Sequence, residues 1–241
     1  RVWRESLGTI KTSADRDEDS FLGSAATIAF SPGDGGILTQ VNLDADRTQE
    51  AGVIQLRYHE RATGDLLHSL TPASGLKLDG FEFSPDGKLL ASTGYFGDDS
   101  QAIEVWQLDT GDLLNTFEFE RGEFWLSEMT FTSNETLKTL SRNPIANVYL
   151  DTWNVRSGER IDRISTLPGV DRQDRIGVFS PGGRYYFIRS DVGGTYIIDT
   201  QTSTATNLDI YVSQIAEFNA TGDYLALESN EDLQIFKRVT P

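Results

Sequence analysis

Cysteine does not occur anywhere in the 241-residue chain. Its absence excludes a disulfide framework, a thiolate metal site and a cysteine nucleophile. A chain without thiols suits an oxidising compartment, where a stray thiol is a liability. The lack of cysteine therefore leans slightly towards a periplasmic or lumenal location, although it leaves a cytoplasmic one open.

Basic side chains are also scarce, with 21 Lys and Arg residues against 37 Asp and Glu residues and a formal net charge of −16. A protein that binds DNA or RNA needs a basic surface that neutralises phosphates, so nucleic acid is excluded as a partner. Docking on an anionic membrane through charge is excluded for the same reason. The acidic side chains serve solubility or, alternatively, form an acidic recognition surface.

Long apolar runs are missing as well. No segment approaches the roughly 20 apolar residues that span a bilayer, so we predict no direct membrane insertion. No signal-peptide pattern is present, and the first residue is Arg1 rather than Met, so we expect a processed chain or a fragment. The apolar residues show no helical periodicity, whereas strong β-formers occur throughout, and this predicts an all-β chain.

Metal and cofactor motifs are equally sparse. The chain has only two histidines, His59 and His68, which are too few for a site built from His and Cys ligands. The segment Asp15–Asp19 starts like an EF-hand loop, but Ser20 stands where that loop needs glycine and Ala26 where it needs glutamate. We therefore interpret it as a solvated acidic loop, and we predict neither a metal nor a cofactor.

A repeated hairpin organises the chain. Each copy is a short apolar strand that ends in Phe, followed by a tight turn and a second apolar strand. The anchors are Phe30, Phe83, Phe131, Phe179 and Phe218, at intervals of 53, 48, 48 and 39 residues. These intervals bracket the roughly 40–45 residues of one propeller blade.

Turn chemistry supports the hairpin, and a second pattern follows it. Phe83-Ser84-Pro85-Asp86-Gly87 places Pro at the first central turn position and Gly where a positive φ is needed. Further on, Trp106 precedes Gly111 by five residues, and Trp153 precedes Gly158 by five. We expect Tyr58 and Gly64 to be the first copy of this pair, with one residue inserted, and the fourth copy to have lost its Gly.

The two patterns together resemble the WD40-repeat family of β-propellers, in a degenerate bacterial-type form with FSPDG turns. Phe83–Gly87 and Val105–Gly111 carry the resemblance most specifically. It implies a β-propeller of about five four-stranded blades. The family's Gly-His is missing, and Gln107 and Asn154 stand where its Trp is followed by Asp. We therefore expect its buried His–Ser/Thr–Asp–Trp network in no blade, and expect apolar packing and turns to hold the blades instead.

One WD40-like domain over residues 1–241 is predicted. Its repeats are expected at about 24–72, 76–120, 125–167, 174–209 and 213–238. The fifth repeat lacks a fourth strand, and an N-terminal strand at 7–11 can supply it, because Trp3 and Gly8 are again five residues apart. Such closure removes exposed strand edges. A closed five-blade ring and a segment of a larger ring both remain open.

The resemblance implies a non-catalytic protein-interaction scaffold or a subunit of a larger protein assembly, with another protein as partner. Loops that join fourth to first strands and second to third strands share one face of a propeller, and that face usually binds. Because aromatic and Arg side chains anchor interfaces, we predict a partner-binding patch of Tyr95, Phe96, Arg121, Phe124, Trp125 and Arg142. Alternatively, Phe124 and Trp125 start a buried strand and fill the space between blades, and Phe96 is buried in the same way.

A second hypothesis is an extracytoplasmic propeller that binds or hydrolyses a carbohydrate. Glycosidases use a pair of carboxylates, and the first strands offer Glu82, Glu128 and Glu217. Neither histidine lies beside a nucleophile motif, and Gly-x-Ser-x-Gly does not occur. We therefore predict no catalytic residues and favour the scaffold.

Overall fold

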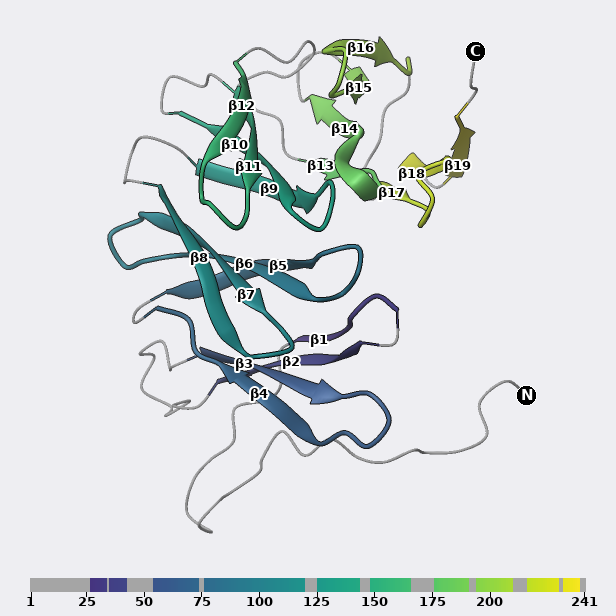
Figure 1. Ribbon diagram of the computed structural model, residues 1–241. Helices are drawn as coiled ribbons and strands as arrows, with labels where there is room; N and C mark the ends of the chain where they lie inside the picture. The colour runs from purple at the N-terminus through teal and green to yellow at the C-terminus, as the bar shows by residue number, and fades with distance from the viewer. Residues whose placement is uncertain are drawn as a thin grey trace, which may run out of the picture. The chain divides into compact units, whose positions relative to one another are not determined.

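A computed structural model describes residues 27–33, 35–42, 54–73, 76–119, 125–143, 148–165, 176–190, 194–209, 216–229 and 232–238. These residues form five antiparallel sheets, and the 3₁₀ turn Pro181–Gly183 is the one helical element among them (Figure 1). The predicted all-β class is therefore confirmed. In the part of the chain that is described, no helix is long and apolar enough to cross a membrane.

Two sheets belong to the first of two compact units, Arg1–Glu118. The first sheet contains β1 (Thr27–Phe30), β2 (Gly36–Asn42), β3 (Ile54–Glu60) and β4 (Leu66–Leu70). The second sheet contains β5 (Lys77–Phe83), β6 (Leu89–Tyr95), β7 (Gln101–Gln107) and β8 (Asp112–Phe119), whose last residue falls in the second unit.

Three sheets belong to the second unit, Phe119–Pro241. The third sheet contains β9 (Trp125–Phe131), β10 (Thr136–Arg142), β11 (Val148–Asn154) and β12 (Arg160–Ile164). The fourth contains β13 (Ile176–Phe179), β14 (Tyr185–Ser190), β15 (Gly194–Asp199) and β16 (Thr204–Asn207). The fifth contains β17 (Ala216–Phe218), β18 (Tyr224–Ser229) and β19 (Asp232–Lys237).

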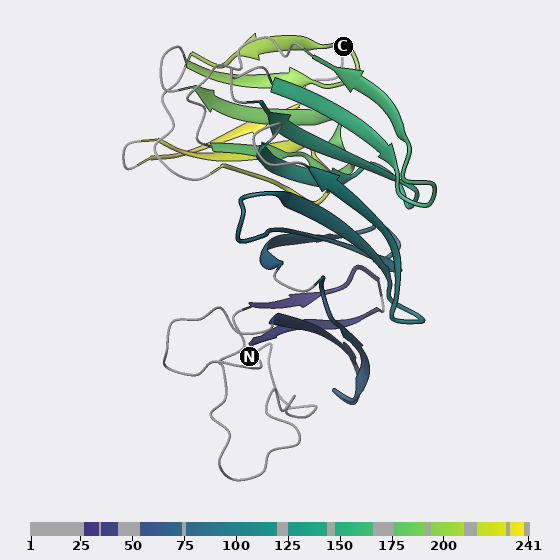
Figure 2. The same ribbon diagram turned by 90° about the vertical axis from the view of Figure 1, so that its left-hand side faces the viewer.

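Neighbouring sheets of each unit share apolar cores. In the first unit, Leu38 and Leu56 of the first sheet pack with Leu90 and Trp106 of the second. In the second unit the fourth sheet packs against the third sheet on one face and against the fifth on the other. Successive side chains of β14 point to opposite faces and so join different cores. Ile188 joins the core shared with the third sheet, and Phe187 joins the core shared with the fifth. Figures 1 and 2 both show these three sheets side by side.

The predicted tight turns form as the sequence indicated. Gly87 has φ +69° and donates its N–H to the carbonyl of Ser84 over 2.8 Å. The Ser84 hydroxyl donates to Asp86 over 2.7 Å and accepts the N–H of Leu89 over 2.9 Å. Burial raises the pKa of Asp86, but the bonds from Ser84 and Lys88 outweigh it and leave the pKa lowered. The carboxylate therefore stabilises the turn.

The expectation about the aromatic–glycine pair of the first repeat was wrong. His59, not Tyr58, occupies the position of Trp106 and Trp153, and it lies five residues before Gly64 with no insertion. The strand registers support this: Ile37 pairs with His59, as Leu90 pairs with Trp106 and Leu137 with Trp153. An imidazole therefore stands in the first sheet where the next two sheets have an indole.

The expectation that apolar packing and turn chemistry hold the sheets in place of a buried hydrogen-bond network was wrong in part. The indole N–H of Trp106 donates to Ser92 over 3.2 Å, and that of Trp153 donates to Thr139 over 2.9 Å. In the first sheet, Nε2 of His59 lies 3.1 Å from the hydroxyl of Thr39. In each case the hydroxyl residue lies two positions beyond the residue that pairs with the aromatic one. A pair of an aromatic side chain and a hydroxyl therefore links the second and third strands in each of these three sheets.

In the last two sheets the same position is apolar. The N–H groups of Leu108, Thr200 and Arg238 donate to equivalent backbone carbonyls, which aligns Trp106 with Ile198 and Phe236. Ile198 is fully buried in the core shared with the third sheet. The glycine that the fourth repeat lacks is replaced by Ser203, whose φ of +56° is left-handed like those of Gly111 (+78°) and Gly158 (+75°).

The predicted closing strand at 7–11 and the acidic segment Asp15–Asp19 lie outside the described residues. The fifth sheet has three described strands, and β19 pairs with β18. The predicted single domain over 1–241, and the choice between a closed ring and a segment of a larger one, stay predictions.

Candidate functional site

The loop after β6 holds two residues of the predicted patch. Tyr95 is 42% exposed at the end of the strand, and the ammonium of Lys77 lies 5.8 Å from the centre of its ring. Phe96 is half-buried and donates its N–H to the carbonyl of Ser100 over 2.8 Å. Asp98 accepts both the N–H and the hydroxyl of Ser100. These bonds give the loop a defined shape that presents an aromatic ring to solvent.

Two further patch residues lie in the second unit, at one end of the third sheet. Arg142 ends β10 and is half-buried, and in the strand register it pairs with Trp125 at the start of β9. Next to it, the side-chain amide of Asn143 donates to the hydroxyl of Tyr149 over 3.3 Å. Arg121 and Phe124 lie outside the described residues. The six-residue patch as one surface therefore stays a prediction.

The three candidate carboxylates lie on the first strands of their sheets, as expected. Glu82 on β5 and Glu128 on β9 are half-buried, whereas Glu217 on β17 is exposed. Glu82 and Glu217 hold the same register position, because they pair with Ala91 and Ala226. Among the residues described, no group of three His, Asp or Glu side chains could hold a metal ion.

A carboxyl group that the sequence analysis did not single out is buried in the first unit. Glu104 on β7 is 1% exposed, and its Oε1 accepts the N–H of Ala73 over 2.8 Å. Its Oε2 is buried with no hydrogen-bond partner. Burial raises the pKa of Glu104, and the bond from Ala73 offsets only part of that effect. The carboxyl therefore holds the connection between β4 and β5 at the cost of an unsatisfied oxygen.

The equivalent carboxyl of the third sheet is fully paired. Asp151 on β11 is completely buried, and Arg163 of β12 donates to its two oxygens over 2.6 and 2.7 Å. The same guanidinium lies 4.6 Å from the centre of the Tyr149 ring. A bidentate, stacked arginine of this kind fixes the position of β12 on β11.

The surroundings of the buried His59 lower its pKa. Burial lowers its pKa and the charge of Arg57 lowers it further, while a hydrogen bond to the carbonyl of Gly64 acts in the opposite direction. Its two ring nitrogens lie 3.1 Å from Thr39 and 3.1 Å from that carbonyl. The ring therefore has a structural role, like the indoles of the next two sheets.

We call the contact region between two neighbouring sheets of one unit a joint. The joints differ in the hydrogen bonds made at the hairpin turns. At the joint of the first and second sheets, the Ser31 hydroxyl donates to the carbonyl of Gly87 over 3.1 Å. At the joint of the third and fourth, the Lys138 ammonium donates to Thr200 over 2.8 Å, and Thr200 donates to the carbonyl of Gly183. Burial lowers the pKa of Lys138, and the charges of Asp162 and Asp199 raise it.

The joint of the fourth and fifth sheets is open. A Cβ atom added to Gly87 would lie 2.5 Å from Ser31 and one added to Gly183 would lie 2.8 Å from Thr132, but at Gly222 the nearest neighbouring atom is 3.6 Å away. The residue equivalent to Thr200 is Arg238, and its guanidinium pairs with Asp223 of its own sheet over 2.6 Å.

A pocket of about 160 Å³ occupies this open joint. It lies at the hairpin-turn end of the strands, opposite the end that carries Arg142, where the predicted patch lies. The joint differs from the preceding one in that Phe187 of the fourth sheet stands at the position that Lys138 holds in the third. The lysine reaches across its joint, whereas the phenyl ring stays in the apolar core.

Comparisons with known proteins give the fold and no family. No family model and no curated protein matches the chain. Among 764 matching solved chains is the β-propeller domain of Cps50 (Swd1) from Myceliophteria thermophila, with a TM-score of 0.60 and 14% identity. The match covers 89% of this chain and 65% of that one. The likeness supports a β-propeller architecture, but a fold shared so widely does not by itself identify a function.

Proposed function

We propose that this chain is a protein-interaction scaffold or a subunit of a larger protein assembly, and that it is not an enzyme. The observation that carries the proposal is a set of five antiparallel sheets, of which the second has an ordered loop with Tyr95 and Phe96 at a strand end. A rigid scaffold with exposed loop aromatics is the usual design of a binding surface. The partner is another protein.

The predicted patch of Tyr95, Phe96, Arg121, Phe124, Trp125 and Arg142 is the proposed contact surface. The loop supports this assignment because its hydrogen bonds already hold it in shape, so little conformational entropy is lost when a partner binds. Lys77 adds a cation beside the exposed Tyr95 ring in a chain of net charge −16, which suits a partner with acidic groups there.

The test is the paired substitution Phe96→Ala and Arg121→Ala in the full chain. We expect binding to a stable partner, measured by native mass spectrometry of the complex from the source organism, to fall at least tenfold while the melting temperature is unchanged. The control is Ile161→Ala with Arg156→Ala, which removes an exposed apolar side chain and an exposed arginine elsewhere. Unchanged binding in the first variant would remove the patch from the proposal.

The carbohydrate hypothesis stays the alternative. Glu82 and Glu217 hold equivalent strand positions, as the hypothesis requires, but no observation favours it further. A chain that is monomeric in native mass spectrometry and that retains or cleaves a glycan would favour this alternative over the scaffold.

A further inference from the structure

The pocket between the fourth and fifth sheets has apolar walls contributed by both. Ile197 and Leu208 come from the fourth sheet and the segment after it, and Phe218 and Phe236 come from the fifth. All four side chains are half-buried, although they pack against the buried core of Phe187. The walls are therefore continuous with the core and still reachable from solvent.

The size of the pocket matches a single apolar side chain. A cavity of about 150 Å³ with apolar walls accepts a ring the size of benzene. The pocket here is of similar size, about 160 Å³, and is open on one side. It therefore has room for one leucine or phenylalanine side chain that belongs to another chain.

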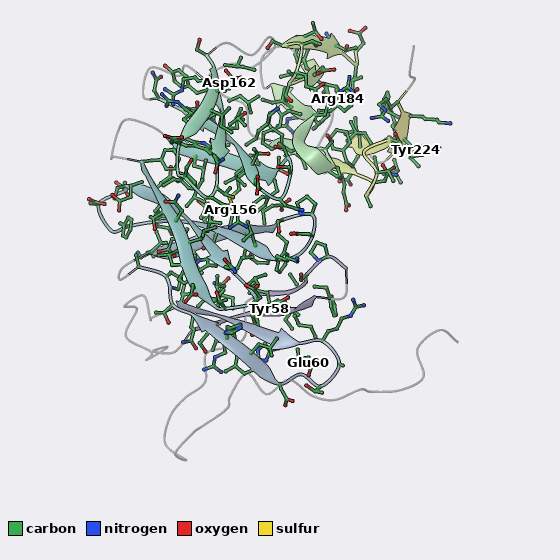
Figure 3. All side chains as sticks on the ribbon, viewed as in Figure 1. Tyr58, Glu60, Arg156, Asp162, Arg184 and Tyr224 are labelled. Atoms are coloured by element: carbon green, nitrogen blue, oxygen red, sulfur yellow. The ribbon has the colours of Figure 1, made fainter. Side chains whose placement is uncertain are left out.

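Lys237 and Arg238 line the pocket together with Asp223, and Arg184 lies over the ring of Tyr185, another lining residue. The guanidinium of Arg184 lies 5.2 Å from the centre of the Tyr185 ring, and that of Arg238 lies 5.8 Å from the same ring. On the other side, the ammonium of Lys237 lies 5.8 Å from the centre of the Tyr224 ring. Figure 3 labels Arg184 on the fourth sheet and Tyr224 on the fifth.

The charges at the mouth favour an acidic ligand. Arg184 pairs with Asp199 over 3.3 Å and Arg238 pairs with Asp223 over 2.6 Å, so Lys237 supplies a net positive charge. The whole chain carries −16, and screening at physiological ionic strength confines the effect of a charge to about 8 Å. A local cation beside an apolar pocket is therefore selective for a carboxylate next to an apolar group.

We propose that this pocket binds one leucine- or phenylalanine-sized side chain from an acidic segment of a partner protein. The side chain fills the apolar pocket, and carboxylates on either side of it face Lys237 and the two arginines. The site shares no residue with the loop patch described above. It goes beyond the proposed function, because it names the chemistry of a second docking segment.

The probe is the blocked peptide acetyl-Asp-Glu-Leu-Asp-Glu-amide, titrated into the full chain and followed by calorimetry and by amide chemical shifts. Two further peptides isolate the two contributions. Serine in place of the central leucine removes the apolar anchor, and lysine in place of the four acidic residues reverses the charge. Since burying a leucine side chain is the main gain, we expect the serine peptide to bind at least tenfold more weakly.

Two variants locate the site, each with a matched control. Lys237→Glu is expected to weaken binding of the leucine peptide about fivefold or more. Lys88→Glu makes the same change in net charge at an exposed turn of the second sheet, outside both proposed surfaces, and is expected to change binding less than twofold. Ile197→Trp fills the pocket and should abolish binding, whereas Ile161→Trp on exposed β12 should not.

Four outcomes overturn the proposal. Equal binding of the leucine and serine peptides means that only charge is recognised. Equal weakening by Lys237→Glu and Lys88→Glu means that the peptide binds elsewhere or senses only net charge. Tighter peptide binding after removal of residues 239–241 assigns the pocket to the chain's own tail, and a dimer that the peptide dissociates in sedimentation assigns it to a second copy. Loss of the loop-patch interaction alone leaves this proposal standing, because the peptide titration does not involve that patch.

Discussion

The first three sheets and the last two differ in the residue that the third strand places at the position of Trp106. In the first three, an indole or imidazole of the third strand bonds a hydroxyl of the second strand, as Trp153 bonds Thr139. In the last two, the position holds Ile198 or Phe236, which packs against apolar neighbours. A repeat can therefore keep its geometry while exchanging a buried hydrogen bond for apolar contact, provided that both partners change together.

The largest effect on stability is expected at the ion pair of Arg163 and the buried Asp151 in the third sheet. Arg163→Leu leaves the carboxylate of Asp151 buried without its two hydrogen bonds, so we expect a loss of about 3–5 kcal/mol in the free energy of unfolding. Denaturant titration measures it. The control Arg156→Leu removes an exposed guanidinium that pairs with Glu135 and should cost about 0–1 kcal/mol. Similar losses in the two variants would contradict the assignment of Asp151 as a buried charge that depends on Arg163.

Next in size is the hydrogen bond between Trp153 and Thr139. Thr139→Val removes the acceptor of a half-buried indole N–H and should cost about 1 kcal/mol. Trp153→Phe in the same chain converts the third sheet to the apolar type, so the double variant should lose less than the sum of the two single ones. A double-mutant cycle in urea measures the coupling. If the losses of the two single variants add up to that of the double variant, an apolar pair cannot replace the hydrogen-bonded pair of Trp153 and Thr139.

A pH-dependent effect is expected at the first sheet. The pKa of His59 is lowered in the folded chain, so folding releases protons from this group. Its contribution to stability is fully present above about pH 6.5, the ordinary pKa of histidine, and is lost as the pH falls towards the lower folded value. His59→Phe with Thr39→Val should flatten that part of the stability–pH curve. An unchanged slope between pH 5 and 7 would rule out this role.

The smallest expected effect concerns the turn that lost its glycine. Ser203 holds a φ of +56° where the first three repeats use Gly. Ser203→Gly should relieve this strain and raise the free energy of unfolding by about 0.5–1 kcal/mol. Thermal unfolding at fixed pH measures it. Ser157→Gly, in the turn just before Gly158, is the control and should bring no gain.

Local patterns predicted most of the architecture. The five Phe anchors and the turn at Phe83–Gly87 lie in short windows of sequence, and the structure has a hairpin at each anchor. Spacing between Trp and Gly likewise predicted third and fourth strands. The role of His59 was missed because Tyr58 is the more typical strand residue, and only the register of β2 with β3 shows which of the two reaches Thr39.

The pocket could not be predicted in this way. It depends on whether a side chain of one sheet reaches the turn of the next, and that is a property of three-dimensional packing. Lys138 makes such a contact, and Phe187 at the equivalent position does not. Two of the six predicted patch residues, Arg121 and Phe124, lie outside the described residues, so the sequence remains their only basis.

The difference in packing between the joints also bears on the order in which the sheets of the second unit unfold. In a chain of stacked repeats, stability is the sum of each repeat and its contacts with the next one, so unfolding starts where a joint is weakest. The turn at Gly222 stands farther from its neighbour than those at Gly87 and Gly183. The fifth sheet should therefore exchange its amide hydrogens first, and an occupant of the adjoining pocket would slow that exchange.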